Sequence, residues 1–240
     1  MSEYISGRNS VKELLKAGQK TVNKILLSRQ AHGEPIKDII KLAKERKIPV
    51  HNVPPEKFDS LGIDDTQGVA AEVSTAVYLE LEELWDRVKE TKNPLIVVMD
   101  GIEDPHNLGA IIRNAVVFGA CGVVIGKWRA AGLTETVSRT SAGAVEHIPV
   151  ARVTNIAEAI SRLKEWGVWT VGAEAEGKPV TEDKFQFPMA LVIGSEGQGL
   201  HRLVKERCDY LVSIPQTSTI SSLNASCASA VLLHEIYKQK

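Results

Sequence analysis

The sequence predicts an α/β fold, in which buried strands alternate with helices along most of the chain. Short apolar runs that suit buried strands occupy residues 94–99 (PLIVVM), 189–193 (MALVI) and 210–214 (YLVSI). After the first run, four apolar residues recur at the spacing of one helix face: Leu108, Ile111, Ile112 and Ala115. A chain of 240 residues, 43% of them apolar, is long enough for one large or two small domains.

The first 74 residues have their own alternation of elements. We expect a helix in 7–17, a strand at 23–28, a helix at 35–46, and strands at 48–51 and 67–73. Asn9 or Ser10 could cap the first helix. This pattern with short loops predicts a small α/β sandwich that ends near residue 74.

The rest of the chain continues in order with a linker and a larger domain. Residues 75–93 are acidic and carry the helical pattern LEELWDRV, so we expect a linker with a short helix. The second domain then spans 94–240, with a further strand at 122–126, helical character in 131–144, and a last helix from about Ser222 to Tyr237.

The first candidate segment for chemistry follows the strand at 94–99. Asn107 and Arg113 lie in the stretch DPHNLGAIIR, with Asn107 where an N-cap belongs and Arg113 nearly two turns further along. Taken by itself, Asn107 is interpreted as a helix cap. Its combination with Arg113 and with two distant polar segments favours a functional site at the carboxyl ends of strands.

The second candidate segment is GSEGQGL at 194–200, directly after the strand at 189–193. Its three glycines indicate backbone that turns sharply or approaches a ligand closely. No Gly-Lys-Ser/Thr follows, so it is no Walker loop, and the glycine order is wrong for a dinucleotide fingerprint. Glu196 could be a helix-start carboxylate or an acceptor that orients a neighbouring amide.

The third candidate segment, SSLNAS at 221–226, follows the strand at 210–214 and a polar stretch. Ser221 or Ser222 could cap the last helix. Capping does not explain the Leu223-Asn224 pair that follows.

Together, the three segments resemble the signatures of the SpoU/TrmH family of RNA ribose 2′-O-methyltransferases. The resemblance covers nearly the whole chain and implies a trefoil-knotted α/β domain of the SPOUT type, S-adenosylmethionine as cofactor, and a homodimer. Carried over by resemblance, the backbone at Gly194, Ile214 and Leu223 would bind the cofactor. The expected active-site residues are Asn107, Arg113, Glu196, Ser222 and Asn224. The chain departs from the family's I-P-M-x-G at Gln216 to Ser218, which bears on the cofactor loop.

The first domain resembles the L30e/L7Ae-like substrate-binding domain of bacterial 23S rRNA guanosine 2′-O-methyltransferases. In that group GRN-x-V and QGV are typical, and this chain has both, at 7–11 and 67–69. The resemblance implies 23S rRNA, or an assembly intermediate of the large subunit, as substrate. Candidate RNA contacts are Arg8, Asn9, Arg129, Arg139 and Ser141.

The implied reaction is displacement at the sulfonium methyl by a ribose 2′-hydroxyl, and alignment can lower such a barrier by roughly 7 to 11 kcal/mol. The resemblance assigns Arg113 as base, but a neutral guanidinium at pH 7 would cost about 7 to 9 kcal/mol. We therefore expect Arg113 to bind the phosphate beside the target ribose, because its planar donor fork suits phosphate. Asn107 and Asn224 are expected to orient the hydroxyl and the loop.

Composition and charge bound the remaining function classes. The net charge is −1, yet residues 1–50 hold eleven basic against five acidic residues, and 51–92 four against ten. This asymmetry fits one face that meets nucleic acid, or simply a solvated surface. The start of the chain lacks the apolar region of a signal peptide, and no apolar run approaches the roughly 20 residues of a membrane span.

The three cysteines, Cys121, Cys208 and Cys227, form no C-x-x-C pair, and the histidines have no H-E-x-x-H spacing. We therefore expect neither disulfides nor a metal, and a cytoplasmic protein. Two alternatives stay open: a tRNA ribose 2′-O-methyltransferase, and a catalytically silent RNA-binding protein of ribosome assembly.

Overall fold

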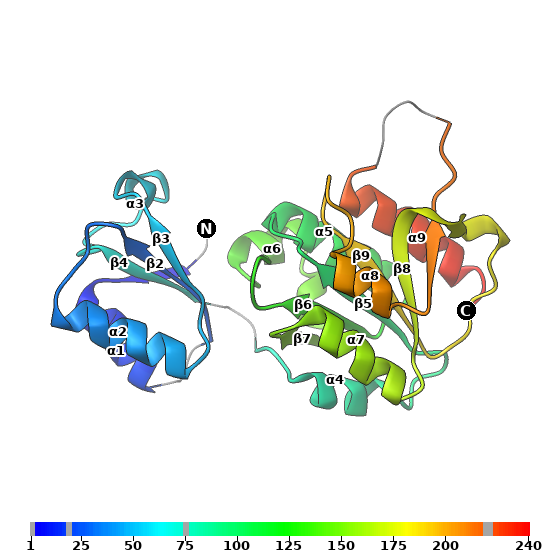
Figure 1. Ribbon diagram of the computed structural model, residues 1–240, viewed down its shortest axis with the longest axis horizontal. Coiled ribbons are helices and arrows are strands. Elements are labelled where there is room, and N and C mark those ends of the chain that lie inside the picture. The colour runs from blue at the N-terminus through cyan, green and yellow to red at the C-terminus, as the bar shows by residue number, and fades with distance from the viewer. Residues whose placement is uncertain (1–2, 18–20, 74–76, 218–222) are drawn as a thin grey trace. The chain divides into compact units, whose positions relative to one another are not determined.

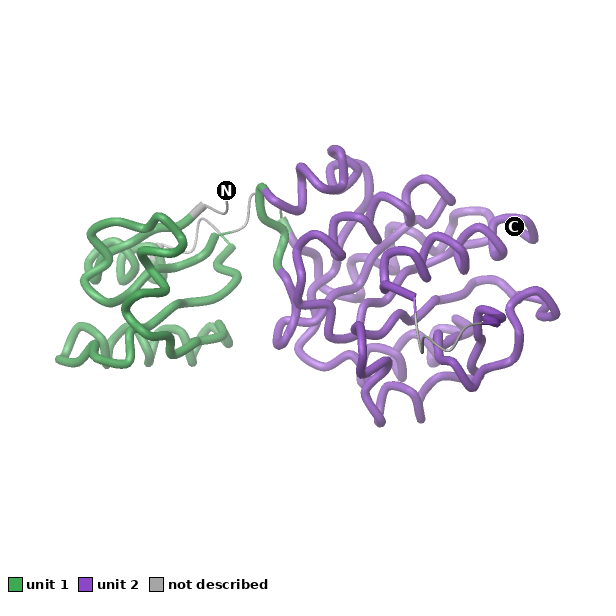
Figure 2. Tube along the Cα trace, turned by 90° about the horizontal axis from the view of Figure 1, so that it is seen from above, with its two compact units in different colours: residues 1–77, 132–135 green, residues 78–131, 136–240 purple. Residues whose placement is uncertain are grey.

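The computed structural model describes residues 3–17, 21–73, 77–217 and 223–240. Two compact units make up the chain (Figure 2): the first comprises residues 1–77 and 132–135, and the second residues 78–131 and 136–240. The expected boundary near residue 74 lies outside the described residues. Each unit has its own sheet and its own apolar core.

The first unit contains a four-stranded sheet with the order β1-β4-β2-β3. Its strands are β1 (Glu3–Ser6), β2 (Val22–Ser28), β3 (Val50–Val53) and β4 (Val69–Val73). β4 pairs antiparallel with β1 and β2, whereas β3 is parallel to β2. The predicted strands are confirmed. β1 was not predicted, because its four residues contain a single aliphatic side chain, Ile5.

Helices cover both faces of this sheet (Figure 1). On one face, α1 (Arg8–Ala17) and α2 (Glu34–Glu45) bury an apolar stripe, including Val11, Leu15 and Ile39, in a common core with β2 and β4. α3 (Glu56–Ser60) places Phe58 in a second cluster with Leu26 and Ala70. Successive side chains of a strand point to opposite faces, so β2 contributes to both clusters. The α/β sandwich predicted for this part is confirmed.

The second unit is built on a six-stranded sheet with the order β10-β8-β9-β5-β6-β7, and all of its strand pairs are parallel. The strands are β5 (Leu95–Asp100), β6 (Gly122–Gly126), β7 (Val150–Val153), β8 (Trp169–Pro179), β9 (Met189–Gly194) and β10 (Tyr210–Ser213). Every residue of β5 is buried, as expected for a central parallel strand. The apolar runs at 94–99, 122–126, 189–193 and 210–214 are thus confirmed as strands.

Helices lie on both faces of this second sheet as well (Figure 1). α4 (Leu81–Val88), α7 (Ile156–Glu165) and α8 (Arg202–Arg207) share a core with alternate residues of β5 and β9. α5 (Pro105–Val117) and α9 (Ala225–Tyr237) pack against each other. The remaining helical segments are α6 (Glu135–Thr140) and the 3-10 turns Ala144–His147 and Val180–Glu182.

The short helix expected within residues 75–93 is α4, and it packs on the second unit. Leu81, Leu84 and Val88 of α4 are buried in the core of the second unit. Trp85 stacks on Trp166, which directly follows α7, with ring centroids 5.9 Å apart. The helix is therefore an integral layer of the second unit and not part of a linker.

The strand order changes direction between β5 and β9. After β5 the chain adds β6 and β7 on one side, and afterwards β8, β9 and β10 on the other. Asp100 and Gly194, the last residues of β5 and β9, are partners in the register, so the loops that follow them start side by side. Ligands of open parallel sheets bind at this kind of reversal, outside the carboxyl ends of the strands.

The starts of three helices differ from the cap candidates that residue preference alone allowed. α5 begins at Pro105 with Asp104 as its N-cap, whose carboxylate accepts the backbone N–H of His106 at 2.9 Å. Proline is preorganised for the first helical position, which moves the start ahead of Asn107. α9 is capped by Asn224, and Ser221 and Ser222 lie outside the described residues. α1 begins at Arg8, so Asn9 and Ser10 belong to its first turn.

Candidate active site

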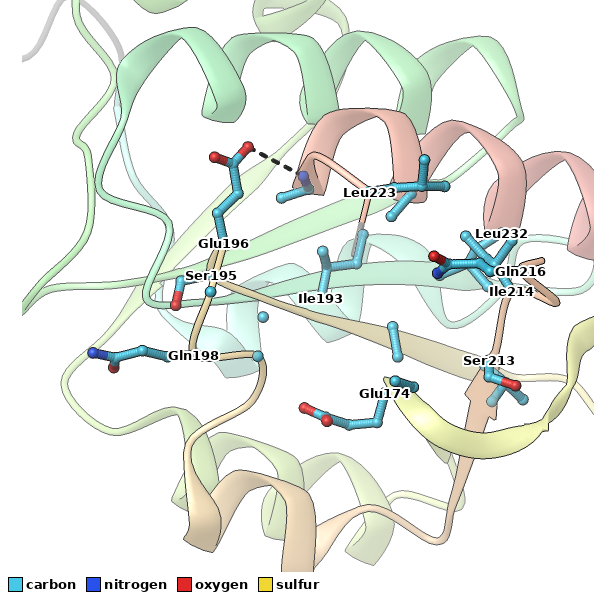
Figure 3. Close-up of a pocket in the computed structure, with 18 residues that line it drawn as sticks. Glu174, Ile193, Ser195, Glu196, Gln198, Ser213, Ile214, Gln216, Leu223 and Leu232 are labelled. Atoms are coloured by element: carbon cyan, nitrogen blue, oxygen red, sulfur yellow. Dashed lines mark hydrogen bonds between the residues drawn. The ribbon is translucent and has the colours of Figure 1, made fainter. Parts of the chain in front are cut away.

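A pocket of about 280 Å³ opens beside the carboxyl end of β9 (Figure 3). Strands β8, β9 and β10, the loop after β9 and the start of α9 contribute its walls. Apolar side chains make up much of the lining, and backbone groups of four small residues between Gly194 and Gly199 complete it. The large apolar side chains of the lining belong to Ile193, Val212, Ile214, Leu223 and Leu232.

The loop after β9 has the tight form that its glycines indicate. Ser195 and Gly199 exchange backbone hydrogen bonds of 3.2 and 3.0 Å, and Gly197 and Gly199 have φ angles of 81° and 64°. A Cβ atom on Gly194 would overlap the backbone of Gly199. Gly194 is therefore required for the loop to fold back on the strand, and both interpretations of the segment, as a turn and as a wall of a ligand site, hold.

Two carboxylates from the neighbouring strands hold the end of this loop. Glu174 of β8 accepts the backbone N–H of Leu200 at 2.6 Å. Asp100 of β5 accepts the backbone N–H of His201 at 2.7 Å and lies 2.9 Å from His201 Nδ1. Because β8 and β5 flank β9 in the sheet, the loop is fixed from both sides.

Next to the pocket, three of the predicted active-site residues form one hydrogen-bond network. Asn107 Nδ2 donates to Glu196 Oε1 at 3.2 Å, and Asn224 Nδ2 donates to Asn107 Oδ1 at 3.1 Å and also to Glu196 Oε1. The backbone N–H of Ala225 donates to the same carboxylate oxygen at 3.3 Å (Figure 3). Glu196 thus fixes the orientation of both amides, the acceptor role expected for it.

Asn224 has a second task besides this network. Its Oδ1 accepts the backbone N–H of Ser226 at 2.9 Å and of Cys227 at 3.4 Å, and so caps α9. An amide whose oxygen caps a helix must turn its nitrogen away from that helix. The cap of α9 therefore directs the donor of Asn224 toward Glu196 and Asn107.

Asn114 of α5 is a supporting residue that the sequence analysis missed. Its side chain donates to Ser226 O and to Ser229 Oγ of α9, both at 2.9 Å. Ser229 is fully buried. These two hydrogen bonds hold α5, which carries Asn107, against α9, which Asn224 caps. A polar residue next to Arg113 on a mainly apolar helix was the available signal, but only the packing of α5 on α9 gives it a partner.

Arg113 lies on α5 six residues after Asn107 and is exposed. It makes no hydrogen bond or ion pair with any residue that the structure describes. Its five donors are therefore available to a ligand. The fifth predicted active-site residue, Ser222, lies outside the described residues.

The residues expected to bind the cofactor lie together. Gly194, Ile214 and Leu223 come from β9, the end of β10 and the start of α9, and all three line the pocket. Gln216, where the chain departs from the family pattern, lines it too, with its side chain beside Ile214 in Figure 3.

The candidate RNA contacts fall into two groups. Arg8 Nε donates to Gln67 O at 3.0 Å, and Gln67 Oε1 accepts the backbone N–H of Arg8 at 3.2 Å, so the GRN and QGV segments meet. Asn9 next to them is exposed, as are Arg129 and Arg139 of the second unit.

Ser141 was expected to contact RNA, and its burial contradicts that expectation. It has no exposed surface, and its hydroxyl donates to Ser138 O at 3.0 Å and accepts from the backbone N–H of Val145 at 3.4 Å. A buried, doubly bonded hydroxyl cannot reach an RNA strand. Its neighbour Arg139, two residues earlier, occupies the exposed face instead.

The thiols lie outside this chemistry. Burial raises the pKa of Cys208 to about 12 and raises the pKa of Cys121 as well. A thiol that keeps its proton at neutral pH is a poor nucleophile. Within the described ranges, no grouping of histidine, cysteine, aspartate and glutamate suits a metal ion, and none of the helices is long and apolar enough to cross a membrane.

A parallel sheet with a pocket beside the carboxyl end of a central strand, an amide–carboxylate network at the pocket's edge and an exposed arginine on the adjoining helix defines an α/β enzyme that aligns two bound reactants. Comparison with known protein families identifies the family to which this enzyme belongs. Residues 94–234 match the SpoU rRNA methylase family, and residues 4–79 match the substrate-binding domain of RNA 2′-O ribose methyltransferases. The chain belongs to the SpoU rRNA methylase family, and it is an RNA methyltransferase with S-adenosylmethionine as cofactor.

Individual relatives agree with this assignment. The TrmH family tRNA/rRNA methyltransferase YacO of Bacillus subtilis is 42% identical over 240 residues, which cover 99% of this chain and 96% of the relative. A TrmH family tRNA/rRNA methyltransferase of Staphylococcus haemolyticus is 43% identical over 238 residues, which cover 98% of this chain and 95% of that relative. The SpoU methyltransferase AviRb of Streptomyces viridochromogenes, solved in complex with AdoMet, superposes with a TM-score of 0.62 at 26% identity over 98% of this chain and 89% of its own. The predicted family and the α/β fold of the SPOUT type are thus confirmed.

Proposed function

We propose that this chain transfers a methyl group from S-adenosylmethionine to the ribose 2′-hydroxyl of a guanosine in 23S rRNA, free or within an assembly intermediate of the large subunit. The observation that carries the proposal is the network of Asn107, Glu196 and Asn224 at the edge of the pocket. It joins three segments that are far apart in the sequence, and the exposed Arg113 lies on the helix that carries Asn107.

The pocket suits the proposed cofactor. A nucleoside with a charged side chain needs apolar walls for its base, backbone groups for its polar edges and acidic groups for its cation, and the lining supplies all three. Gly194, Ile214 and Leu223 would hold it, and when bound it supplies a methyl group on a good leaving group.

The side chains around the pocket would orient the target ribose and bind the phosphate beside it. Glu196 and Asn224 fix the amide of Asn107, whose second N–H would be available to the target ribose without reorganisation during the reaction. Both N–H groups of Asn224 are taken by Glu196 and Asn107, so Asn224 orients the loop and the Asn107 amide. Arg113 binds the phosphate beside that ribose and steadies the 2′-oxygen as its proton leaves. Ser222 completes the group by resemblance. Since alignment can contribute roughly 7 to 11 kcal/mol, positioning is the larger part of the catalysis.

The first unit supports a ribosomal RNA substrate. Residues 4–79 match a substrate-binding domain, and the sequence of this unit is basic up to residue 50. We propose that residues 1–74 bind RNA, with Arg8 and Asn9 at the meeting point of the GRN and QGV segments, and that Arg129 and Arg139 contribute from the second unit. The reaction would take place in the cytoplasm, where rRNA is assembled in bacteria.

We also propose that the chain works as a homodimer and that the second unit carries the family's trefoil knot. Support for the dimer comes from apolar side chains exposed on the two adjoining helices: Val117 of α5, and Val231 and Tyr237 of α9, with 65%, 39% and 56% exposure. Side chains of this kind on neighbouring helices suit an interface.

The test is transfer of labelled methyl from S-adenosylmethionine to purified 23S rRNA and, separately, to tRNA, followed by alkaline hydrolysis. A 2′-O-methylated ribose protects its phosphodiester linkage, so a protected 2′-O-methylguanosine from 23S rRNA that disappears with Arg113→Ala is expected. Label in tRNA alone would replace the rRNA assignment, and the relatives named tRNA/rRNA methyltransferases make that comparison necessary. Label only in immature large-subunit particles would identify an assembly intermediate as substrate.

A further inference from the structure

The charge of the pocket is one-sided. Among the described residues that line it, Glu174 and Glu196 are acidic and none is basic. Residues 218–222, outside the described ranges, have no charged side chain in the sequence. Any ligand in this pocket therefore meets a negative field, which strengthens as the ligand displaces water.

Glu174 is the more enclosed of the two carboxylates. Its side chain is 13% exposed, and the backbone N–H of Leu200 donates to Oε1 at 2.6 Å. Figure 3 shows the side chain extending from β8 toward the loop that carries Ser195 and Gln198. Its position is thus fixed by the strand on one side and by the loop on the other.

The charge of Glu174 is only weakly balanced by the protein. The nearest cation is Lys205 Nζ, 3.7 Å from Oε2, and this lysine makes its closer contact with Glu176. Glu176 has a side chain that is 63% exposed and does not line the pocket. A shielded carboxylate that shares its lysine with another acid attracts further positive charge.

The two forms of the cofactor, before and after methyl transfer, differ in positive charge. S-adenosylmethionine carries a positive sulfonium, and S-adenosylhomocysteine, the product of methyl transfer, has a neutral sulfur and lacks the methyl group. Adenine, ribose and the amino acid end are the same in both. We propose that Glu174 is a specificity-determining residue, which makes the pocket favour the cationic cofactor over its neutral product. The proposal rests on the assignment of this pocket to the cofactor.

Two other roles for Glu174 make different predictions. If the carboxylate only holds the loop through Leu200, or accepts hydrogen bonds from the ribose hydroxyls, its loss weakens both ligands equally, because both need the loop and both have the ribose. Only an effect of charge on the sulfur separates one ligand from the other.

The experiment compares wild-type protein with Glu174→Gln by titration calorimetry, with S-adenosylmethionine and S-adenosylhomocysteine in turn. Glutamine keeps an oxygen that can accept from Leu200 N–H, and it replaces the charged carboxylate by a neutral amide of nearly the same shape. The preference for the cationic ligand, expressed as the ratio of the two Kd values, is expected to fall about tenfold. A tenfold change in this ratio corresponds to about 1.4 kcal/mol, a moderate electrostatic effect for one unit charge in a partly solvated pocket. An analogue with a protonated amine in place of the methylated sulfur should lose affinity as S-adenosylmethionine does.

Glu176→Gln is the matched control. It makes the same chemical change two residues away, beside the same lysine, and should leave the ratio within about twofold of wild type because screening weakens an exposed charge. Equal weakening of both ligands by Glu174→Gln, or an equal change of the ratio by Glu176→Gln, would overturn the proposal.

A blocking variant tests the underlying assignment separately. Leu223→Trp adds bulk at the wall of the pocket and should weaken both ligands together. Unchanged binding of both in this variant would show that the cofactor binds elsewhere, a failure distinct from an unchanged ratio in Glu174→Gln.

Discussion

The double role of Asn224 can be separated by one substitution, Asn224→Asp. Aspartate caps helices as well as asparagine does, so the bonds from Ser226 N–H and Cys227 N–H to Oδ1 are retained. The Nδ2 donor, however, becomes an oxygen that faces Glu196 Oε1 and Asn107 Oδ1. We expect the free energy of unfolding to stay within about 0.5 kcal/mol of wild type, and catalysis to fail.

The size of the catalytic effect follows from this geometry. Two carboxylates about 4 Å apart repel by about 4 kcal/mol at an effective dielectric constant of about 20, and solvent at this exposed site reduces that to about 1 to 2 kcal/mol. Loss of the two donated hydrogen bonds adds about 1 to 2 kcal/mol. In the resting protein the exposed side chains can move apart, so the free energy of unfolding changes little. Re-forming the native arrangement for catalysis then costs about 2 to 4 kcal/mol, which corresponds to a decrease in kcat/KM of about 30- to 1000-fold.

The assay is single-turnover methyl transfer to rRNA, with urea unfolding in parallel. Asn155→Asp is the control, since Asn155 caps α7 through Glu158 N–H at 3.2 Å and has no contact with the network. Lowering the pH from 8 to 6 should recover part of the loss in Asn224→Asp, because a shared proton replaces the missing donor. If Asn224→Asp kept kcat/KM within threefold of wild type, the network would have no part in catalysis.

Four further predictions concern single residues. Arg113→Lys should lower kcat at least about tenfold in the same assay, because an ammonium lacks the planar fork; a kcat close to wild type would contradict the guanidinium-specific role. Gly194→Ala should abolish calorimetric binding of the cofactor, since its Cβ would overlap the loop backbone; normal affinity would show that the loop adapts. Asn114→Ala should lower the free energy of unfolding by about 1 to 3 kcal/mol in urea, because buried acceptors lose a donor. With an aromatic disulfide reagent at pH 8, the exposed Cys227 should react first and Cys208, whose pKa is raised to about 12, only after unfolding; labelling of Cys208 in the folded protein would contradict this.

Strands were the part of the fold that the sequence predicted best. Parallel strands buried on both faces are continuous apolar runs, and those of β5, β6 and β9 stand out against polar flanks. β8 was not predicted, because its second half, from Ala173 on, alternates small and charged residues and is only partly buried. The order of strands in the sheet depends on long-range pairing, which no local pattern encodes.

The candidate active-site residues were predicted by motif, and their supporting contacts were not. Asn107, Glu196 and Asn224 carry signatures, so the sequence could group them before any contact was known. Glu174 lies on the unpredicted strand β8, and its bond to Leu200 depends on that strand being next to β9. The starts of helices differed from the cap candidates because local preference allowed several polar residues, and the decision between them came from Pro105 for α5 and from the network around Asn224 for α9.

The network around Glu196 also sets an order of events during translation. Its donors come from α5, and from Asn224 and Ala225 at the start of α9, so the set is complete only after synthesis has reached the start of the last described helix. The first unit, with its own sheet and core, is made much earlier. Under the proposed function, a nascent chain has a finished substrate-binding unit before this network can form, and truncations before Asn224 should yield proteins that bind RNA without methylating it.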